Sequence, residues 1–260
     1  MNVMDLLKCL TLPINHNWGD KIPNPKGALY FRDNGASVLA VAHLDSVMVR
    51  KPILRKNSVV GTPQLDDRLG VWVLLDLLPK LGVTIDVLLT DCEERGLSTA
   101  EYFTPPREYN WMFAFDRRGA DVVMYQYEHS EYVDLVENYG FHVNWGTYSD
   151  ICSLEHLGIT GFNIGAGYYR EHTRQCHADL NVTKRQAERF ARFWTDHNAT
   201  PLPAVITNLA NPDNNFCNYW KSDDWWWTIN KLANEYDYDS VSEFIRDGGL
   251  ELCDMRHVED

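Results

Sequence analysis

The chain has 260 residues, of which 45% are hydrophobic and 12% are aromatic. A chain of this kind buries enough apolar surface for one globular domain with a small appendage, which excludes disorder as its main state. Its 37 acidic residues outnumber the 24 basic ones and give a formal charge of -13, so nucleic acid is excluded as an expected partner. No apolar run approaches the ~18 residues of a membrane helix, so we expect no membrane partner either.

Strand-sized apolar runs alternate with helix-sized stretches in the first 198 residues. The expected strands are 38–42, 85–90, 111–115, 122–127 and 159–164, and the expected helices are 69–78 and 182–197. This alternation predicts an α/β fold, a three-layer sandwich with a mixed, mostly parallel central sheet. Asp33-Asn34-Gly35, between the runs 29–32 and 37–42, is typical of a hairpin turn and predicts one antiparallel pair there.

The character of the sequence changes near residue 198. Residues 1–198 are expected to form the main domain, and residues 199–260 a Trp-rich, mostly helical C-terminal extension that begins with a connector rich in Pro and Asn. We expect its tryptophans to pack the extension onto the main domain, the alternative being an aromatic rim over a cleft or a subunit contact.

The start of the chain and its cysteines predict a cytoplasmic protein. Residues 1–10 lack the basic start and the small-residue cleavage site of a secretory signal. The six cysteines are scattered without a Cys-x-x-Cys pair, which favours free thiols over disulfides or a zinc knot.

Acidic and histidine residues follow the predicted strands directly or open the helix between them. These residues are His43, Asp45, Asp66, Glu93, Glu94, Asp116 and His172. In an open α/β sheet the carboxyl ends of the strands line the ligand-binding edge, so we expect these side chains to meet there. Core packing has no use for such polar groups, and their position therefore predicts a functional site.

The residue types at this edge suit divalent metal ions. Two imidazoles and several carboxylates, with no thiolate among them, are ligands for hard or borderline ions such as zinc. One shared carboxylate, with one His and one further carboxylate for each ion, would build a two-metal site. Asp45 lies two residues after His43 and suits a carboxylate that fixes the imidazole. Glu93 is adjacent to Glu94, so one of the two is free to act as a base.

Six segments, in this order, resemble the co-catalytic di-zinc exopeptidases. This superfamily includes single-domain bacterial aminopeptidases, glutaminyl cyclases, and larger tripeptidase and carboxypeptidase relatives. The matching segments are AHLDS (42–46), QLDDRLG (64–70), DCEERG (91–96), FDRRG (115–119), YSDICSLEHLGI (148–159) and EHT (171–173). The interval between the last ligand positions is too short for the inserted dimerisation domain of the tripeptidase-like relatives, so the resemblance implies the compact catalytic domain.

The resemblance implies a role for each residue at the edge. Two divalent ions, expected to be zinc, would share Asp66, with a cis peptide between Asp66 and Asp67. The ligands would be His43 and Asp116 at one ion and Glu94 and His172 at the other. Glu93 would be the general base that activates a di-zinc-bound hydroxide, and Asp45 the carboxylate behind the first imidazole. Tyr148 and Asp150 would lie near the substrate.

Two assignments have competing interpretations. His177 belongs to a second His-x-Asp sequence and competes with His172 for the last ligand position, although the His-Thr pattern favours His172. Arg117 could bind a substrate carboxylate, which would favour a dipeptidase or carboxypeptidase. The alternative is an ion pair that balances the acidic site, and we favour it slightly.

The sequence therefore predicts a metal-dependent hydrolase of a peptide or other amide bond, with an aminopeptidase as the first choice. The alternatives are a dipeptidase or carboxypeptidase, an amide deacylase, a single-zinc glutaminyl cyclase, and a non-catalytic binding homologue. A homologue without activity would be expected to lack the base or a ligand, and all of these are present. The expected partner is a peptide or small amide substrate, and a homo-oligomer is left open.

Overall fold

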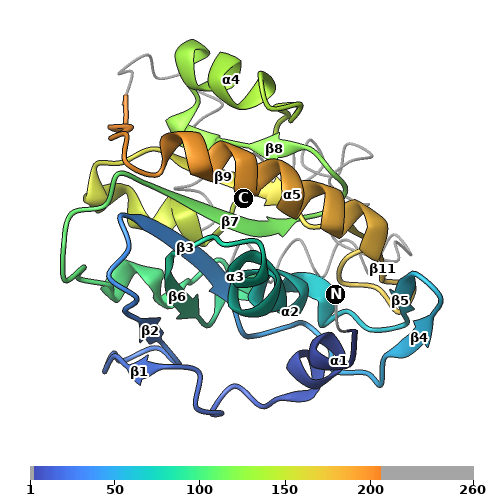
Figure 1. The fold of residues 1–260 in the computed structure, drawn as a ribbon. Coiled ribbons are helices and arrows are strands. Elements are labelled where there is room, and N and C mark those ends of the chain that lie inside the picture. Colours follow the sequence, from blue (N-terminus) through green and yellow to red (C-terminus); the bar gives the residue numbers. More distant parts are fainter. Residues whose placement is uncertain (1–2, 206–260) are drawn as a thin grey trace, which may run out of the picture. The chain divides into compact units, whose positions relative to one another are not determined.

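The computed structural model describes residues 3–205, and the predicted extension beyond residue 205 lies outside the described residues. The described chain forms a large mixed sheet with helices on both faces and a smaller sheet beside it (Figure 1). From one edge to the other, the large sheet contains β1 (Asp20–Lys21), β2 (Tyr30–Arg32), β6 (Asp86–Thr90), β3 (Val38–His43), β7 (Trp111–Arg117), β9 (Gly161–Gly165) and β8 (Val122–Val123).

The centre of the large sheet is parallel and its edges are antiparallel. β3 pairs in parallel with both β6 and β7, and β7 pairs in parallel with β9. The small sheet is antiparallel, in the order β10 (Tyr168–Tyr169), β11 (His177–Asp179), β5 (Ser58–Val60) and β4 (Ile53–Arg55). The parallel pairing brings the carboxyl ends of β3, β6 and β7 to one edge.

The helices and helical turns lie between these strands. The α-helices are α1 (Val3–Thr11), α2 (Leu65–Trp72), α3 (Leu78–Lys80), α4 (Ser130–Glu137) and α5 (Leu180–His197). A π-helical turn, η1 (Val73–Leu77), joins α2 to α3, and the 3-10 turns are η2 (Glu93–Arg95), η3 (Thr99–Tyr102), η4 (Tyr125–Tyr127) and η5 (Asp150–Leu157). No helix of residues 3–205 is long and apolar enough to cross a bilayer.

Alternate residues of the central strands enter two apolar cores, one on each face of the large sheet. In β3, Val38, Ala40 and Ala42 face the core that includes α1, α2 and α5, whereas Leu39 and Val41 face the core that includes η3 and η5. This period of two, with both faces buried, is typical of a central strand in a three-layer sandwich. The predicted fold class is therefore confirmed for the described chain.

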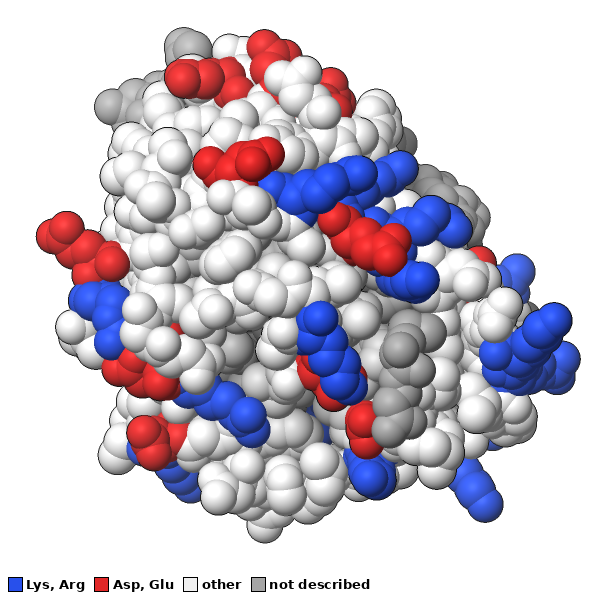
Figure 2. Space-filling model, viewed as in Figure 1, with Lys and Arg blue, Asp and Glu red and all other residues white. Residues whose placement is uncertain are grey.

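Helix α5 is amphipathic, as its spacing predicts. Asp179 caps its first turn by accepting the backbone N–H of Asn181 at 2.9 Å. Phe190 and Phe193 pack against Trp111 of β7 in the core. The opposite face of the helix is exposed and basic, and Figure 2 shows Lys and Arg side chains gathered there.

Two local predictions are wrong. Gly35 has a φ of 73° and donates its N–H to Oδ1 of Asp33 at 2.9 Å, but β2 does not pair with β3, because β6 lies between them. Asp86, at the start of β6, accepts the backbone N–H groups of Asn34 (2.7 Å) and Ala36 (3.0 Å), so the turn is fixed to β6 instead. The predicted strand 122–127 stops after two residues and continues as η4, whose first residue Tyr125 has a φ of 50°.

Candidate active site

The residues predicted to meet at the sheet edge do meet. Within residues 3–205 the structure brings them into two groups of possible metal ligands, with the candidate ligand atoms of each group within 4.8 Å of one another. The first group is His43, Asp66 and Asp116, and the second is Asp66, Glu94 and His172. These are the five residues that the motif resemblance indicates, and Asp66 belongs to both groups.

The first group is built by two neighbouring strands and the start of a helix. His43 is the last residue of β3, and Asp116 lies near the carboxyl end of β7. The Nε2 atom of His43 lies 3.3 Å from Oδ1 of Asp66 and 3.4 Å from Oδ1 of Asp116. All three residues have little or no solvent exposure.

The second group uses the other oxygen of Asp66. Nε2 of His172 lies 3.2 Å from Oδ2 of Asp66 and 2.8 Å from Oε2 of Glu94. Glu94 stands in η2, directly after β6, and His172 lies in the loop between β10 and β11. The peptide bond between Asp66 and Asp67 is cis, as the resemblance implies.

The donor set fits two divalent ions. It offers imidazole nitrogen and carboxylate oxygen without a thiolate, the ligands suited to zinc and similar metals. Zinc bonds of about 2.0–2.2 Å place tetrahedral donors roughly 3.3–3.6 Å apart. Three of the four distances given above lie near that range and the fourth, 2.8 Å, is shorter. The residues present could therefore hold one ion in each group, with Asp66 between them.

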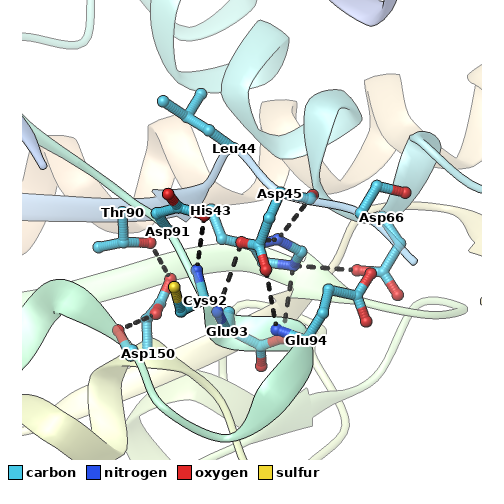
Figure 3. A network of polar contacts seen from close by, with 12 residues as sticks. His43, Leu44, Asp45, Asp66, Thr90, Asp91, Cys92, Glu93, Glu94 and Asp150 are labelled. Carbon is cyan, nitrogen blue, oxygen red and sulfur yellow. Dashed lines mark hydrogen bonds and ion pairs between the residues drawn. The ribbon is translucent and has the colours of Figure 1, made fainter. Parts of the chain in front are cut away.

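Asp45 connects the first imidazole to the turn that carries the two glutamates (Figure 3). Nδ1 of His43 lies 3.2 Å from the backbone carbonyl oxygen of Asp45 and 3.4 Å from its Oδ1 atom, and these contacts leave Nε2 directed at the group. The backbone N–H of Glu93 donates to Oδ1 at 3.4 Å, and that of Glu94 donates to Oδ2 at 3.2 Å. One carboxylate thus orients a candidate ligand and also holds η2 in place.

Glu93 lies beside the histidine of the first group and, like Asp45, belongs to neither group. Its Oε2 atom lies 3.7 Å from Nε2 of His43, and 14% of its side chain is exposed. Burial, together with the negative charges of Asp116 and Asp150, raises the pKa of Glu93 well above its usual range. A carboxylate whose pKa is raised is a stronger base than a free one, which suits a group that accepts a proton.

The electrostatics of the two groups follow from their crowding. Burial opposes the charged imidazolium of His43, but the carboxylates of Asp116 and Glu93 outweigh it and raise its pKa well above 6.5. For His172 burial is outweighed in the same way, chiefly by Glu94.

Burial raises the pKa of Asp116 to about 7. For Asp66 the two histidines outweigh burial, and its pKa lies below the usual value. Protons therefore occupy part of the site near neutral pH.

Asp67 and Arg68 build the start of α2 rather than either ligand group. Oδ1 of Asp67 accepts the backbone N–H of Gly70 at 3.1 Å. The guanidinium of Arg68 donates to the carbonyl of Leu44 at 2.9 Å and lies over the ring of Trp18. These contacts fix the segment that holds Asp66 against the end of β3.

The residues predicted to bind substrate differ in their surroundings. The hydroxyl of Tyr148 lies 3.0 Å from that of Ser153. Asp150 is buried, and its two oxygens accept hydrogen bonds from the hydroxyls of Thr90 (2.5 Å, Figure 3) and Ser98. Arg117 forms an ion pair with Asp121 at 3.1 Å, outside both ligand groups, and donates to the carbonyl of Trp145.

The competing histidine lies outside both groups. His177 stands on β11, its ring stacks on that of Tyr169, and its Nδ1 lies 3.1 Å from the carbonyl oxygen of Gln175. The second basic residue after β7, Arg118, is paired with Glu171 at 2.8 Å. Among the described residues, His172 is thus the histidine that joins Asp66 and Glu94.

Two hydroxyl groups contact the first group: that of Ser149, in the loop that the resemblance places near the cleft, and that of Tyr168, which sequence reasoning missed. The hydroxyl of Tyr168 lies 3.2 Å from Oδ1 of Asp66 and 3.4 Å from Oδ1 of Asp116, and that of Ser149 donates to Oδ2 of Asp116 at 3.2 Å. A signal for Tyr168 existed, because it follows the glycine-rich end of a predicted strand and precedes His172 by four residues. Nothing in the sequence alone separates it from Tyr169.

Solved structures share this fold at low sequence identity. The aminopeptidase PepT from Bacillus cereus matches with a TM-score of 0.53 and 10% identity, over 74% of this chain and 96% of its own. A tripeptidase from Staphylococcus aureus matches with a TM-score of 0.51 and 10% identity, over 74% of this chain and 90% of its own. PhTET1-12s, a dodecamer in its crystal, matches with a TM-score of 0.50 and 14% identity, over 74% and 98%.

These likenesses establish the fold. The sequence matches no family model and no curated protein sequence. The chain nevertheless has the fold of aminopeptidase and tripeptidase structures, so the resemblance predicted from its motifs is confirmed at the level of fold.

Proposed function

We propose that this chain is a metal-dependent hydrolase of peptide bonds, and specifically an aminopeptidase. The observation that carries the proposal is the pair of buried ligand groups that share Asp66, with Glu93 beside them and outside both. The likeness in fold to an aminopeptidase and a tripeptidase supports the same substrate class. Zinc is the proposed metal because the donors are imidazole and carboxylate.

His43 and Asp116 would hold one ion, Glu94 and His172 the other, and Asp66 both. When bound, two such ions act as Lewis acids towards a carbonyl oxygen and make a water molecule more acidic. Asp45 keeps Nε2 of His43 directed at the first group through its contact with Nδ1.

Glu93 would carry the proton during hydrolysis. Its carboxylate accepts a proton from the water that attacks the scissile carbonyl, and the carbon–nitrogen bond breaks as the same proton passes to the leaving amine. The raised pKa makes Glu93 a stronger base than an exposed carboxylate, which supports its role in accepting the proton.

The arginines after β7 favour an aminopeptidase over an enzyme that binds a substrate carboxylate. Arg117 is paired with Asp121 and Arg118 with Glu171, so each guanidinium already has an acidic partner. A dipeptidase or carboxypeptidase would use such a group to bind the terminal carboxylate bidentately. We therefore assign both arginines a structural role beside the site and not a role in binding substrate.

The test is metal content and amide hydrolysis by the purified full chain, beside Glu93→Gln. We expect about two zinc ions per chain, hydrolysis of aminoacyl-p-nitroanilides, and a loss of ~10²–10⁴-fold in kcat for Glu93→Gln with its metal retained. Glu155→Gln, the same chemical change at an exposed position, is the matched control.

Three outcomes would change the proposal. Metal binding with hydrolysis of dipeptides or N-acyl amino acids, but not of aminoacyl anilides, would replace the aminopeptidase by a dipeptidase or a deacylase. Metal binding without turnover of any amide would leave a binding protein or a glutaminyl cyclase. Failure to bind metal would remove the proposal altogether.

A further inference from the structure

Tyr168 closes a ring of donor atoms around the first ligand group. Its hydroxyl oxygen lies 3.2 Å from Oδ1 of Asp66 and 3.4 Å from Oδ1 of Asp116. The same two oxygens lie 3.3 Å and 3.4 Å from Nε2 of His43. The four atoms therefore form a closed ring with nearly equal sides, in which Tyr168 and His43 occupy opposite corners.

The contact is specific to one half of the site. Asp66 directs Oδ1 towards His43 and Tyr168, and Oδ2 towards His172. Asp116, the other partner of the Tyr168 hydroxyl, belongs only to the first group. The hydroxyl thus touches both carboxylates of the first group on the oxygens that face its histidine.

The side chain is well placed to hold these carboxylates still. Tyr168 is 2% exposed, and it begins β10, whose pairing with β11 fixes its backbone. Oδ2 of Asp116 is held separately by Ser149. Without the Tyr168 hydroxyl, His43 would be the remaining partner on the Oδ1 side of both carboxylates among the contacts described. Groups that orient metal ligands in this way commonly change metal affinity by 10–100-fold.

We propose that Tyr168 is a positioning residue for the first metal site, which holds Oδ1 of Asp66 and Oδ1 of Asp116 in the orientation needed to share an ion with His43. The inference rests on the proposed metal-dependent function. It adds a difference between the two metal sites, because the Tyr168 hydroxyl contacts the first group through Oδ1 of Asp66 and Oδ1 of Asp116, whereas the contacts described do not join it to Glu94 or His172.

The experiment isolates the two groups. His172→Ala leaves the first group as the intact one, and His43→Ala leaves the second. Zinc affinity is measured in each background by equilibrium dialysis of the full metal-free chain, with and without Tyr168→Phe. Tyr169→Phe is the matched control, since it removes the same atom from the next residue, whose ring stacks on His177. Tyr168→Met provides a second variant if the Phe variant does not fold.

We expect Tyr168→Phe to lower the zinc affinity of the first group by about 10–100-fold and that of the second by less than about 3-fold. Tyr169→Phe should leave both affinities unchanged. The thermal midpoint of metal-free Tyr168→Phe should stay close to that of the parent, because the ring remains packed.

Several results would overturn the inference. One is an unchanged affinity in the first group. Another is an equal loss in both groups, which would indicate a general packing role. A tyrosinate absorption band that appears with zinc and is absent from Tyr168→Phe would show the hydroxyl to be a ligand itself. Failure of the parent and of both backgrounds to bind zinc would remove the proposed function as well, so the two failures are distinguishable.

Discussion

The two halves of the site differ in what holds them. In the first, His43 ends β3 with 1% of its side chain exposed, and Asp116 stands on the adjacent strand β7 with 6% exposed. In the second, Glu94 lies in a short 3-10 turn, and His172 lies in a loop with a φ of 61° and 22% of its side chain exposed. Strand ladders fix one half, whereas turns and loops fix the other.

The shared carboxylate of Asp66 therefore joins a half mounted on strands to a half mounted on a turn and a loop. Ligands mounted on paired strands are placed more reproducibly than ligands mounted on loops. We therefore expect the first site to bind metal more tightly and exchange it more slowly. The second site, with its more exposed histidine, should load last and be the first to lose its metal to a chelator.

The largest effect is expected for Asp66→Asn, because this substitution alters the one residue that belongs to both halves of the site. Each oxygen of Asp66 serves a different histidine, so the amide should weaken both sites together. We expect metal content near zero and a loss of hydrolysis of at least about 10⁴-fold, since both ions and their several kcal/mol of transition-state stabilisation are lost. Metal analysis of the dialysed variant checks this, and retention of one full equivalent would contradict it.

Replacing the two histidines one at a time measures the zinc affinity of each half separately. His43→Ala and His172→Ala should each remove one zinc equivalent and weaken that site by more than the ~10–100-fold typical of an outer partner. We expect the metal that remains in His172→Ala to bind more tightly than the one that remains in His43→Ala. Competition with a chromogenic chelator measures both affinities. Equal affinities would show that strand mounting does not matter here.

The stability of the metal-free protein should depend on pH differently from that of the zinc-loaded protein. Burial raises the pKa of Asp116 to about 7, and nearby carboxylates raise those of His43 and His172 despite burial. The folded metal-free chain therefore holds protons that the unfolded chain has released, and these groups lose their contribution to stability as pH rises from about 4 through 7 and above.

Zinc must displace the same protons, so its apparent affinity should rise by up to about tenfold per pH unit for each proton displaced. The increase in thermal midpoint on adding zinc should thus be larger at about pH 8 than at about pH 5.5, with roughly 2–4 °C for each kcal/mol. Differential scanning fluorimetry at both pH values measures it. A gain that does not depend on pH would mean that the ligands are already unprotonated in the empty site.

The smallest effect is expected for His177→Ala. This histidine stacks on Tyr169 and contacts neither ligand group, so zinc content and affinity should change by less than about 2-fold. Equilibrium dialysis of the variant measures both the zinc content and the affinity. Loss of one zinc equivalent would give His177 the ligand role that its His-x-Asp sequence suggests and would displace His172.

The sequence predicted the part of the fold that depends on short-range pattern. The run 38–42 becomes β3, one residue longer, and the polar residues after the strands arrive at one edge because the strands are parallel. Apolar periodicity and the position of ligands at strand ends are local properties, and they are therefore readable from a single chain.

What the sequence did not predict depends on distant partners. The sequence at Asp33 carries a good hairpin signal, yet β2 pairs with β6, and Asp86 of β6 accepts the N–H of Asn34, 52 residues away. Tyr168 reaches Asp66 across 102 residues through the register of the small sheet. The residues around Asn34 and Tyr168 do not name these partners, because pairing between strands is decided by the whole fold.

The double attachment of Asp45 has a consequence for how this scaffold can vary. A single side chain ties the end of β3 to the turn after β6, so the spacing between Glu93 and His43 does not depend on the length of the loops on either side. The segment after Asp45 is less independent, because Val47 donates its backbone N–H to Oε1 of Glu94 at 3.3 Å and residues 53–55 form β4. A graft between Val47 and β4 that keeps Asp45 and Val47 should therefore leave the distance between Glu93 and His43 unchanged.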